Sequence, residues 1–158
     1  TGSRGDVVVR SGEALAPMDL DGLAVEVAVG GGFTCVVLDT GVAQCVGYNW
    51  HGQLDVGKVG LGKVKQIVGG AQHTCVLLED DRVACVGNNW YGQSGKKSGE
   101  VIEGFTAQFL AAGEYHTCAL SDGRVFCWGR NWEGAVGQGT TWFIGGVPQL
   151  VDWLRAGV

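Results

Sequence analysis

The sequence predicts an all-β repeat protein, because it contains a hairpin signal, repeats that signal, and has strands that are apolar on both faces. The hairpin signal lies near the C-terminal end, where Asp122-Gly123 separates two cysteine-bearing segments. A two-residue type I′ turn needs positive φ at both central positions, which Asp-Gly adopts readily. In that register Cys118 faces Cys127 as a non-hydrogen-bonded pair, whose Cβ atoms lie closest together. The segment is therefore predicted to be a hairpin stapled by a disulfide.

The same pattern occurs twice more upstream. Cys35 and Cys75 are 40 residues apart, and Cys75 and Cys118 are 43 apart. A repeat of this length decides an architecture before any single motif can. In the first two units the cysteines are one residue further apart, which predicts three-residue loops at 39–41 and 79–81. The predicted disulfides are Cys35–Cys45, Cys75–Cys85 and Cys118–Cys127.

Both faces of the predicted hairpins are largely apolar. In the third unit, one face carries Leu120 and Val125, and the other carries Ala119, Phe126 and Trp128. A sheet of this kind must be covered on both sides. The pattern therefore predicts sheets stacked side by side.

The segments H-T-C-A-L, D-G-R-V, C-W-G-R-N and N-W-x-G-Q resemble the repeats of the regulator of chromosome condensation family, over roughly residues 24 to 158. That family builds seven-bladed β-propellers, and the cysteine pairs resemble its secreted, disulfide-bearing variant. A chain of 158 residues is too short to close a propeller of four to eight blades. The resemblance therefore implies an incomplete propeller, an arc of about three to four blades that are each a four-stranded antiparallel sheet.

Several positions depart from the family pattern. The Trp of the W-G step survives only as Trp128, and Val46 and Val86 stand in its place elsewhere. Phe33 occupies the position of a His in the other units, and Ala135 replaces a Gln.

The repeat defines expected boundaries and an expected context. We interpret the chain as a fragment, a processed piece, or a subunit completed by a partner. Its partners are then other proteins or the rest of a longer propeller chain. The expected segments are 1–23, the tail of a preceding repeat; 24–69, 70–112 and 113–150, three repeats; and 151–158, the start of a further blade.

Cysteine usage and charge restrict the compartment and the partners. Six cysteines in three matched pairs, without a C-x-x-C, indicate disulfides rather than zinc ligands. Such pairs favour an oxidising compartment: extracellular, periplasmic or an organelle lumen. The net charge of −5 argues against nucleic-acid binding. The sequence has no transmembrane run, so we expect no membrane insertion.

One repeated position looks at first like a site for acid–base chemistry. His73 and His116 recur in register, but Phe33 occupies the same position in the first unit. Phenylalanine carries no proton, so the position selects a ring. The predicted register sets each ring opposite a glycine, which we interpret as a ring covering that glycine. The facing pairs are Phe33 with Gly47, His73 with Gly87, and His116 with Gly129.

Other motifs carry less weight. Residues 57–63 match part of a phosphate-binding loop but lack the hydroxyl residue that should follow. Arg4-Gly5-Asp6 resembles an integrin-binding tripeptide and is equally compatible with a solvated loop. We find no catalytic motif and predict a protein that is not an enzyme, with no cofactor and no metal.

One feature stands out from the scaffold: a Trp follows the Asn of each post-hairpin loop, at Trp50, Trp90 and Trp132. Packing under the neighbouring blade is the favoured interpretation, with Trp90 the most packed because repeats flank it on both sides. The alternative is that each Trp anchors a partner. The residues beside them, which would set specificity, are His51, Tyr91 and Glu133.

These observations favour a non-catalytic protein–protein interaction or structural module, a subunit or fragment of a larger assembly. The alternative is a propeller-type inhibitor or regulator of an enzyme. It would present loop aromatics to its target, as the β-lactamase inhibitors of the resembled fold do.

Overall fold

The computed structural model describes residues 20–59 and 62–151, whose strands form three antiparallel sheets. The expected segments at 1–23 and 151–158 lie almost wholly outside these residues, and Arg4-Gly5-Asp6 lies entirely outside them. The first sheet contains β1 (Ala24–Gly30), β2 (Phe33–Leu38) and β3 (Ala43–Gly47). The second contains β4 (Val64–Gly69), β5 (His73–Leu78), β6 (Arg82–Gly87) and β7 (Val101–Thr106). The third contains β8 (Phe109–Ala112), β9 (His116–Ser121), β10 (Arg124–Gly129) and β11 (Gly145–Leu150).

The hairpin register predicted from the turns is confirmed in all three units. Asp122 and Gly123 have φ of 48° and 74°, as a type I′ turn requires, and Ser121 pairs with Arg124. The first two hairpins have three-residue loops whose last residue is left-handed, with φ of 81° at Gly41 and 68° at Asp81. The facing cysteine pairs follow from these registers: Cys35 with Cys45, Cys75 with Cys85, and Cys118 with Cys127.

The prediction of four strands in every blade is wrong for the first sheet, which has three in the part of the chain that is described. The first unit is the shorter one, since Cys35 and Cys75 are 40 residues apart while Cys75 and Cys118 are 43 apart. After β3 the chain forms the 3₁₀-helix η1 (Asp55–Val59) where the second unit continues toward β7. The shorter connection leaves fewer residues to run back along β3 as an outer strand.

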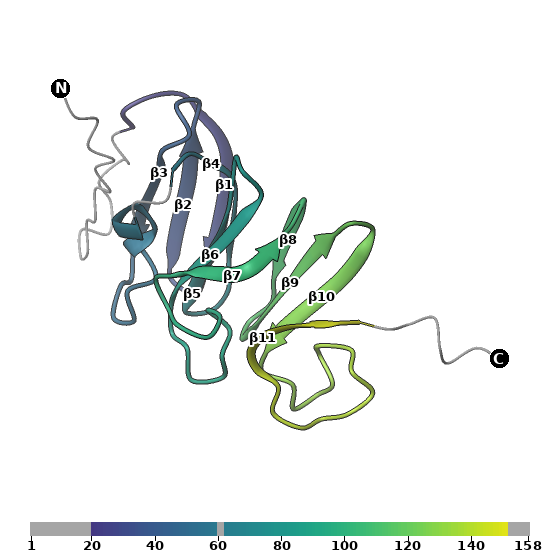
Figure 1. Cartoon of the computed structure of the whole chain (residues 1–158). Coiled ribbons are helices and arrows are strands. Elements are labelled where there is room, and N and C mark those ends of the chain that lie inside the picture. The colour runs from purple at the N-terminus through teal and green to yellow at the C-terminus, as the bar shows by residue number, and fades with distance from the viewer. Residues whose placement is uncertain (1–19, 60–61, 152–158) are drawn as a thin grey trace.

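The three sheets lie side by side in chain order and do not close on themselves (Figure 1). Two apolar cores lie between them. One includes Val37 and Val76 and joins the first sheet to the second. The other includes Leu77 and Trp128 and joins the second to the third. The middle strand β5 is buried along its whole length, so the prediction of sheets covered on both sides is confirmed for the central blade.

Hydrogen bonds between neighbouring sheets recur with the period of the sequence. Backbone amides on the turns before the first two hairpins donate to the next sheet, whereas threonine hydroxyls on the second and third sheets donate to the loop of the preceding unit. A side chain on the first strand of one sheet accepts from the backbone of the next. The backbone bonds are Gly31 to Gly70 and Ala71 to Glu114. The hydroxyl bonds are Thr74 to the Gln53 carbonyl and Thr117 to the Gln93 carbonyl. The side-chain acceptors are Glu26 for Ile67 N–H and Gln66 for Leu110 N–H.

The residues Phe33, His73 and His116 face the predicted glycines across their hairpins. The prediction that their rings cover those glycines is wrong, because each ring covers a different glycine. A Cβ added to Gly70 would lie 2.1 Å from the His73 ring and 2.7 Å from the Gly113 carbonyl oxygen of the next sheet. A Cβ on Gly87 would instead meet backbone, 2.5 Å from the Gln72 oxygen. The rings therefore lie over the glycines three residues before them. These covered glycines are Gly30, Gly70 and Gly113.

Candidate partner-binding face

The loops that follow β3, β6 and β10 lie on the same side of the molecule, at the bottom of Figure 1. Each loop folds around the side chain of its asparagine. The carbonyl oxygen of that side chain accepts the backbone N–H of the residue five positions ahead, and its amide donates to a later oxygen of the same segment. The accepted bonds are Leu54 N–H to Asn49 (2.9 Å), Ser94 N–H to Asn89 (2.9 Å) and Val136 N–H to Asn131 (3.1 Å).

The tryptophan next to each asparagine points away from the blade. The exposed fraction of the side chain is 85% for Trp50, 76% for Trp90 and 56% for Trp132. The expectation that these residues pack under a neighbouring blade is therefore wrong, and so is the ranking that made Trp90 the most packed. The physical reason is local, because the asparagine turns inward to bind the loop backbone and the following side chain is then directed outward.

The residue after each tryptophan reaches the tryptophan of the next unit. His51 packs edge-on against Trp90 with ring centroids 5.7 Å apart, and Tyr91 packs edge-on against Trp132 at 5.2 Å. Glu133, the third member of this set, forms an ion pair with Arg130. The repeat thus builds a continuous line of rings across the blades.

Arg130 completes the far end of this line. Its guanidinium carbon lies 4.6 Å from the centre of the Trp132 ring and 5.1 Å from that of Tyr115. At the other end Tyr48 stacks on Trp50, with ring centroids 6.0 Å apart. We call this set the aromatic row; its members are Tyr48, Trp50, His51, Trp90, Tyr91, Tyr115, Arg130 and Trp132.

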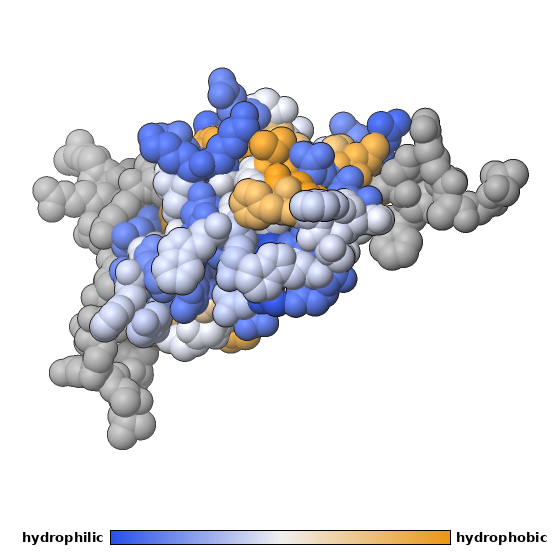
Figure 2. Space-filling model, turned by 90° about the horizontal axis from the view of Figure 1, so that it is seen from below, coloured by the Kyte–Doolittle hydropathy of each residue, from blue (hydrophilic) through white to orange (hydrophobic). Residues whose placement is uncertain are grey.

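Figure 2 views the molecule from the side of these loops. Pale side chains of intermediate hydropathy gather across the middle of this face, and that is the colour that Trp and Tyr take on this scale. A surface of exposed rings is typical of contact sites, since Trp and Tyr bury a large area at little cost in side-chain entropy.

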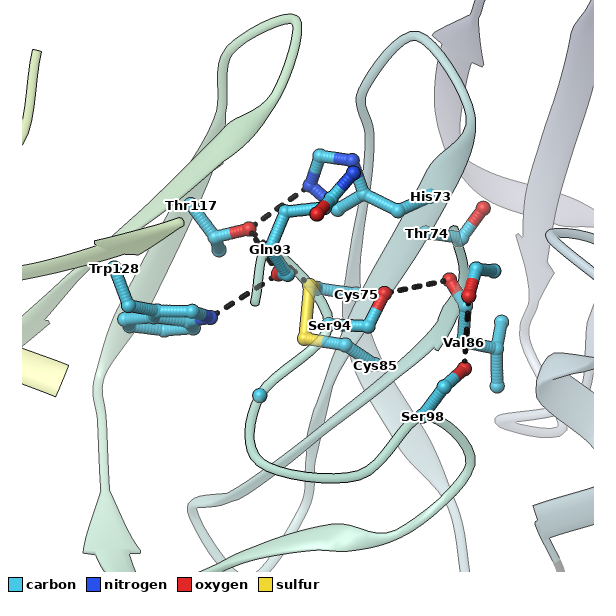
Figure 3. The surroundings of a disulfide bond; sticks show 12 residues. His73, Thr74, Cys75, Cys85, Val86, Gln93, Ser94, Ser98, Thr117 and Trp128 are labelled. Atoms are coloured by element: carbon cyan, nitrogen blue, oxygen red, sulfur yellow. Dashed lines mark hydrogen bonds between the residues drawn. A yellow bond between two sulfur atoms is a disulfide. The ribbon is translucent and has the colours of Figure 1, made fainter. Parts of the chain in front are cut away.

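The histidine position belongs to the scaffold rather than to this face. His73 is fully buried between the second and third sheets, and its Nε2 lies 2.9 Å from the hydroxyl of Thr117 (Figure 3). Burial lowers the pKa of His73 to about 4, with a smaller contribution from His116. The same hydroxyl donates to the Gln93 carbonyl, which also accepts the indole N–H of Trp128. This group of contacts joins two blades.

The groove between β7 and β11 is a second surface feature, of about 720 Å³. Two of its cationic side chains have anionic partners, because Arg82 pairs with Asp80 and Lys97 with Glu100. The third cationic side chain of the lining is Lys96. The aromatic row is the stronger candidate, because it presents three tryptophans that are more than half exposed.

Residues 57–63 contribute nothing to either surface in the described part of the chain, and Gly60 and Leu61 lie outside it. Across residues 20–59 and 62–151, no three His, Cys, Asp or Glu side chains gather as metal ligands would. No helix within the described ranges is long and apolar enough to cross a membrane.

The three cysteine pairs lie at disulfide distance, and they differ in access to solvent. Cys35, Cys45, Cys75 and Cys85 are fully buried, whereas Cys127 is 4% exposed and Cys118 is partly exposed on the open face of the third sheet.

We expect the Cys118–Cys127 disulfide to be reduced first, because a thiolate must reach a sulfur atom to exchange with it. Brief glutathione treatment of the folded chain, followed by alkylation and peptide mapping, measures the order. Equal labelling of Cys75 and Cys118 at every time point would contradict the prediction.

Three unclosed antiparallel sheets joined by recurring contacts define an incomplete β-propeller built from repeats. A family model for the Regulator of chromosome condensation (RCC1) repeat matches residues 64–93 and 108–135. A second model for the same repeat matches residues 122–157. The chain belongs to this repeat family. A search of curated protein sequences finds no match.

Solved structures give the same fold. Human WBSCR16 is similar over 84% of this chain and 41% of its own, with a TM-score of 0.71 and 26% identity. Prp20p from Saccharomyces cerevisiae is similar over 87% of this chain and 41% of its own, at TM-score 0.70 and 22% identity. The ectodomain of the Physcomitrella patens receptor kinase CR4 is similar over 76% of this chain and 33% of its own, with a TM-score of 0.60 and 23% identity. The chain thus spans about two fifths of the length of the first two.

Proposed function

We propose that the chain is a non-catalytic protein-interaction module whose contact face is the aromatic row. The exposure of Trp50, Trp90 and Trp132 carries this proposal. Trp, Tyr and Arg are the residues most enriched at the energetic centres of protein interfaces, and the row consists almost entirely of them. Prp20p binds Gsp1p and histones, and a second structure has Kap60 bound to it. Those partners belong to Prp20p, but they support protein binding as a use of this fold.

A displayed library of protein domains, selected on the immobilised chain, tests the proposal. Binding of the selected domains is expected to fall at least about 30-fold when Trp50, Trp90 and Trp132 are all changed to Ala, since a central aromatic anchor contributes roughly 2 kcal/mol or more. Changing one of these exposed residues should alter the free energy of unfolding by only about 0.5 kcal/mol. Trp142, which is 81% exposed and lies outside the row, supplies the control Trp142→Ala. Selected domains that bind the triple variant as tightly as the wild type would overturn the proposal.

A second proposal concerns the two ends of the arc, which we propose are covered by further blades from a longer chain or a partner. On β1, Val25, Val27 and Val29 are 64–68% exposed on one face of the strand. On the third sheet Phe109 is 55% exposed. Monomers rarely leave large apolar faces in water, and such faces mark contacts.

The chain by itself is therefore expected to associate, and sedimentation velocity over a concentration series measures this. A monomer at every concentration that also melts cooperatively would contradict the proposal. This second proposal keeps the predicted repeat boundaries, which are 24–69, 70–112 and 113–150.

We also propose that the protein works in an oxidising compartment. Three facing cysteine pairs at disulfide distance support this, since glutathione and thioredoxin keep cytosolic thiols reduced. Alkylation of freshly isolated material, unfolded in denaturant without reductant so that buried thiols are accessible, should label no cysteine, and stoichiometric labelling would overturn the assignment.

A further inference from the structure

We infer that the partner segment recognised by the aromatic row is proline-rich and extended, in the polyproline II conformation. The inference rests on the proposed function and names its partner. It follows from the rigidity of the row, from its hydrogen-bonding groups and from the repetition of its rings.

The row is held in place by backbone-to-glutamine contacts that the first two units share. The N–H of His51 donates to Gln53 Oε1 at 3.0 Å, and the N–H of Tyr91 donates to Gln93 Oε1 at the same distance. These glutamines are fully buried, so the loops are fixed to the blades beneath them. A preformed site loses little entropy on binding. Polyproline II is likewise formed before binding, so neither side must be ordered.

The row offers free hydrogen-bond donors on its three tryptophans. In the part of the chain that the structure describes, the indole N–H groups of Trp50, Trp90 and Trp132 have no acceptor. The carboxylates at hand have partners, because Glu133 pairs with Arg130 and Asp55 accepts from Asn49. A proline segment presents carbonyl acceptors and no N–H donors. Its carbonyl groups therefore complement the indole donors of the row.

The rings repeat once per blade, and the ring pairs that join neighbouring blades are edge-on. Tyr91 stands edge-on both to Trp132, with the ring planes at 75°, and to Tyr115, at 70°. Arg130 lies over the Trp132 and Tyr115 rings, but Trp50 and Trp90 are largely exposed, and pyrrolidine rings can pack on such exposed rings. Polyproline II has three residues per turn and fully solvated carbonyls. Domains that read proline-rich segments use aromatic-lined grooves in this way.

The test uses the 158-residue chain and a proline decapeptide, with a Gly-Ser peptide of equal length and cellohexaose as comparison ligands. Intrinsic tryptophan fluorescence and calorimetry measure binding. The proline peptide is expected to bind saturably, with a dissociation constant that rises about tenfold or more in Trp90→Ala and is unchanged in Trp142→Ala. Trp90→Phe keeps a ring but loses the indole donor, so its affinity should fall between wild type and Trp90→Ala.

Several outcomes would overturn the inference: no saturable binding of the proline peptide, binding that Trp90→Ala leaves intact, or saturable binding of cellohexaose or the Gly-Ser peptide with equal affinity. Circular dichroism of each variant shows that folding is retained. If library-selected domains need the three tryptophans while the proline peptide does not bind, the contact face holds and only the partner class fails. If the selected domains also ignore the tryptophans, the proposed function fails with it.

Discussion

Replacing Trp128 by alanine is expected to lower the free energy of unfolding by about 3–5 kcal/mol. Trp128 is fully buried between the second and third sheets, and it packs edge-on against Phe105 with ring centroids 5.9 Å apart. Its indole N–H donates to the Gln93 carbonyl at 3.1 Å, which ties the loop after β6 to the next blade. The variant would leave a cavity in the core that joins the two sheets. Urea unfolding followed by circular dichroism, with the disulfides intact, measures the loss.

Two variants control for this loss. Trp142→Ala removes the same side chain from an exposed position, so the free energy of unfolding should change by only about 0.5 kcal/mol. Trp128→Phe keeps most of the buried volume and removes the hydrogen bond, which contributes about 1 kcal/mol. An effect of Trp128→Ala no larger than that of Trp142→Ala would show that this core does not hold the blades together.

Acidification is expected to destabilise the chain by about 3 kcal/mol through His73 alone, between pH 6.5 and 4. The pKa of this histidine is lowered from 6.5 to about 4, mainly because burial disfavours the charged ring. Above pH 6.5 the ring is neutral in both states and contributes no pH dependence. Between pH 6.5 and 4 the unfolded chain takes up a proton that the native chain does not, so stability falls. Below about pH 4 both states bind the proton and this loss is complete.

The chain contains its own control, because Phe33 occupies the position of His73 in the first unit. His73→Phe should abolish this part of the acid sensitivity and cost about 1 kcal/mol at neutral pH for the lost bond to Thr117. His116, whose pKa is also lowered by burial, remains and leaves a smaller slope of the same sign. Urea unfolding at intervals from pH 7 to 4 measures both slopes. Equal slopes in wild type and His73→Phe would contradict the assignment.

The direction of the tryptophans is the clearest point at which the sequence pattern predicts the wrong outcome. The recurrence of Trp after Asn marks these loop positions as special. Whether the tryptophan side chain is buried, however, does not depend on packing between blades. The deciding contact is local: the asparagine side chain accepts the N–H five residues ahead, and the tryptophan turns outward. The recurrence of Asn itself is the signal that could have indicated this, since Asn often organises loops through its side chain.

The sequence alone determined what depends on short-range chemistry. Turn residues that adopt positive φ fix a hairpin's register, so the facing cysteines and the loop lengths could be predicted from the residues alone. The repeat length likewise predicted an architecture of stacked sheets, because each unit is one local motif. Only the tertiary structure decided what depends on the distance between blades. His73 lies over Gly70 rather than over its cross-strand partner, at a point where an added Cβ would also meet the Gly113 carbonyl of the next sheet. The line of rings from Tyr48 to Trp132 likewise exists only because neighbouring blades set their loops side by side.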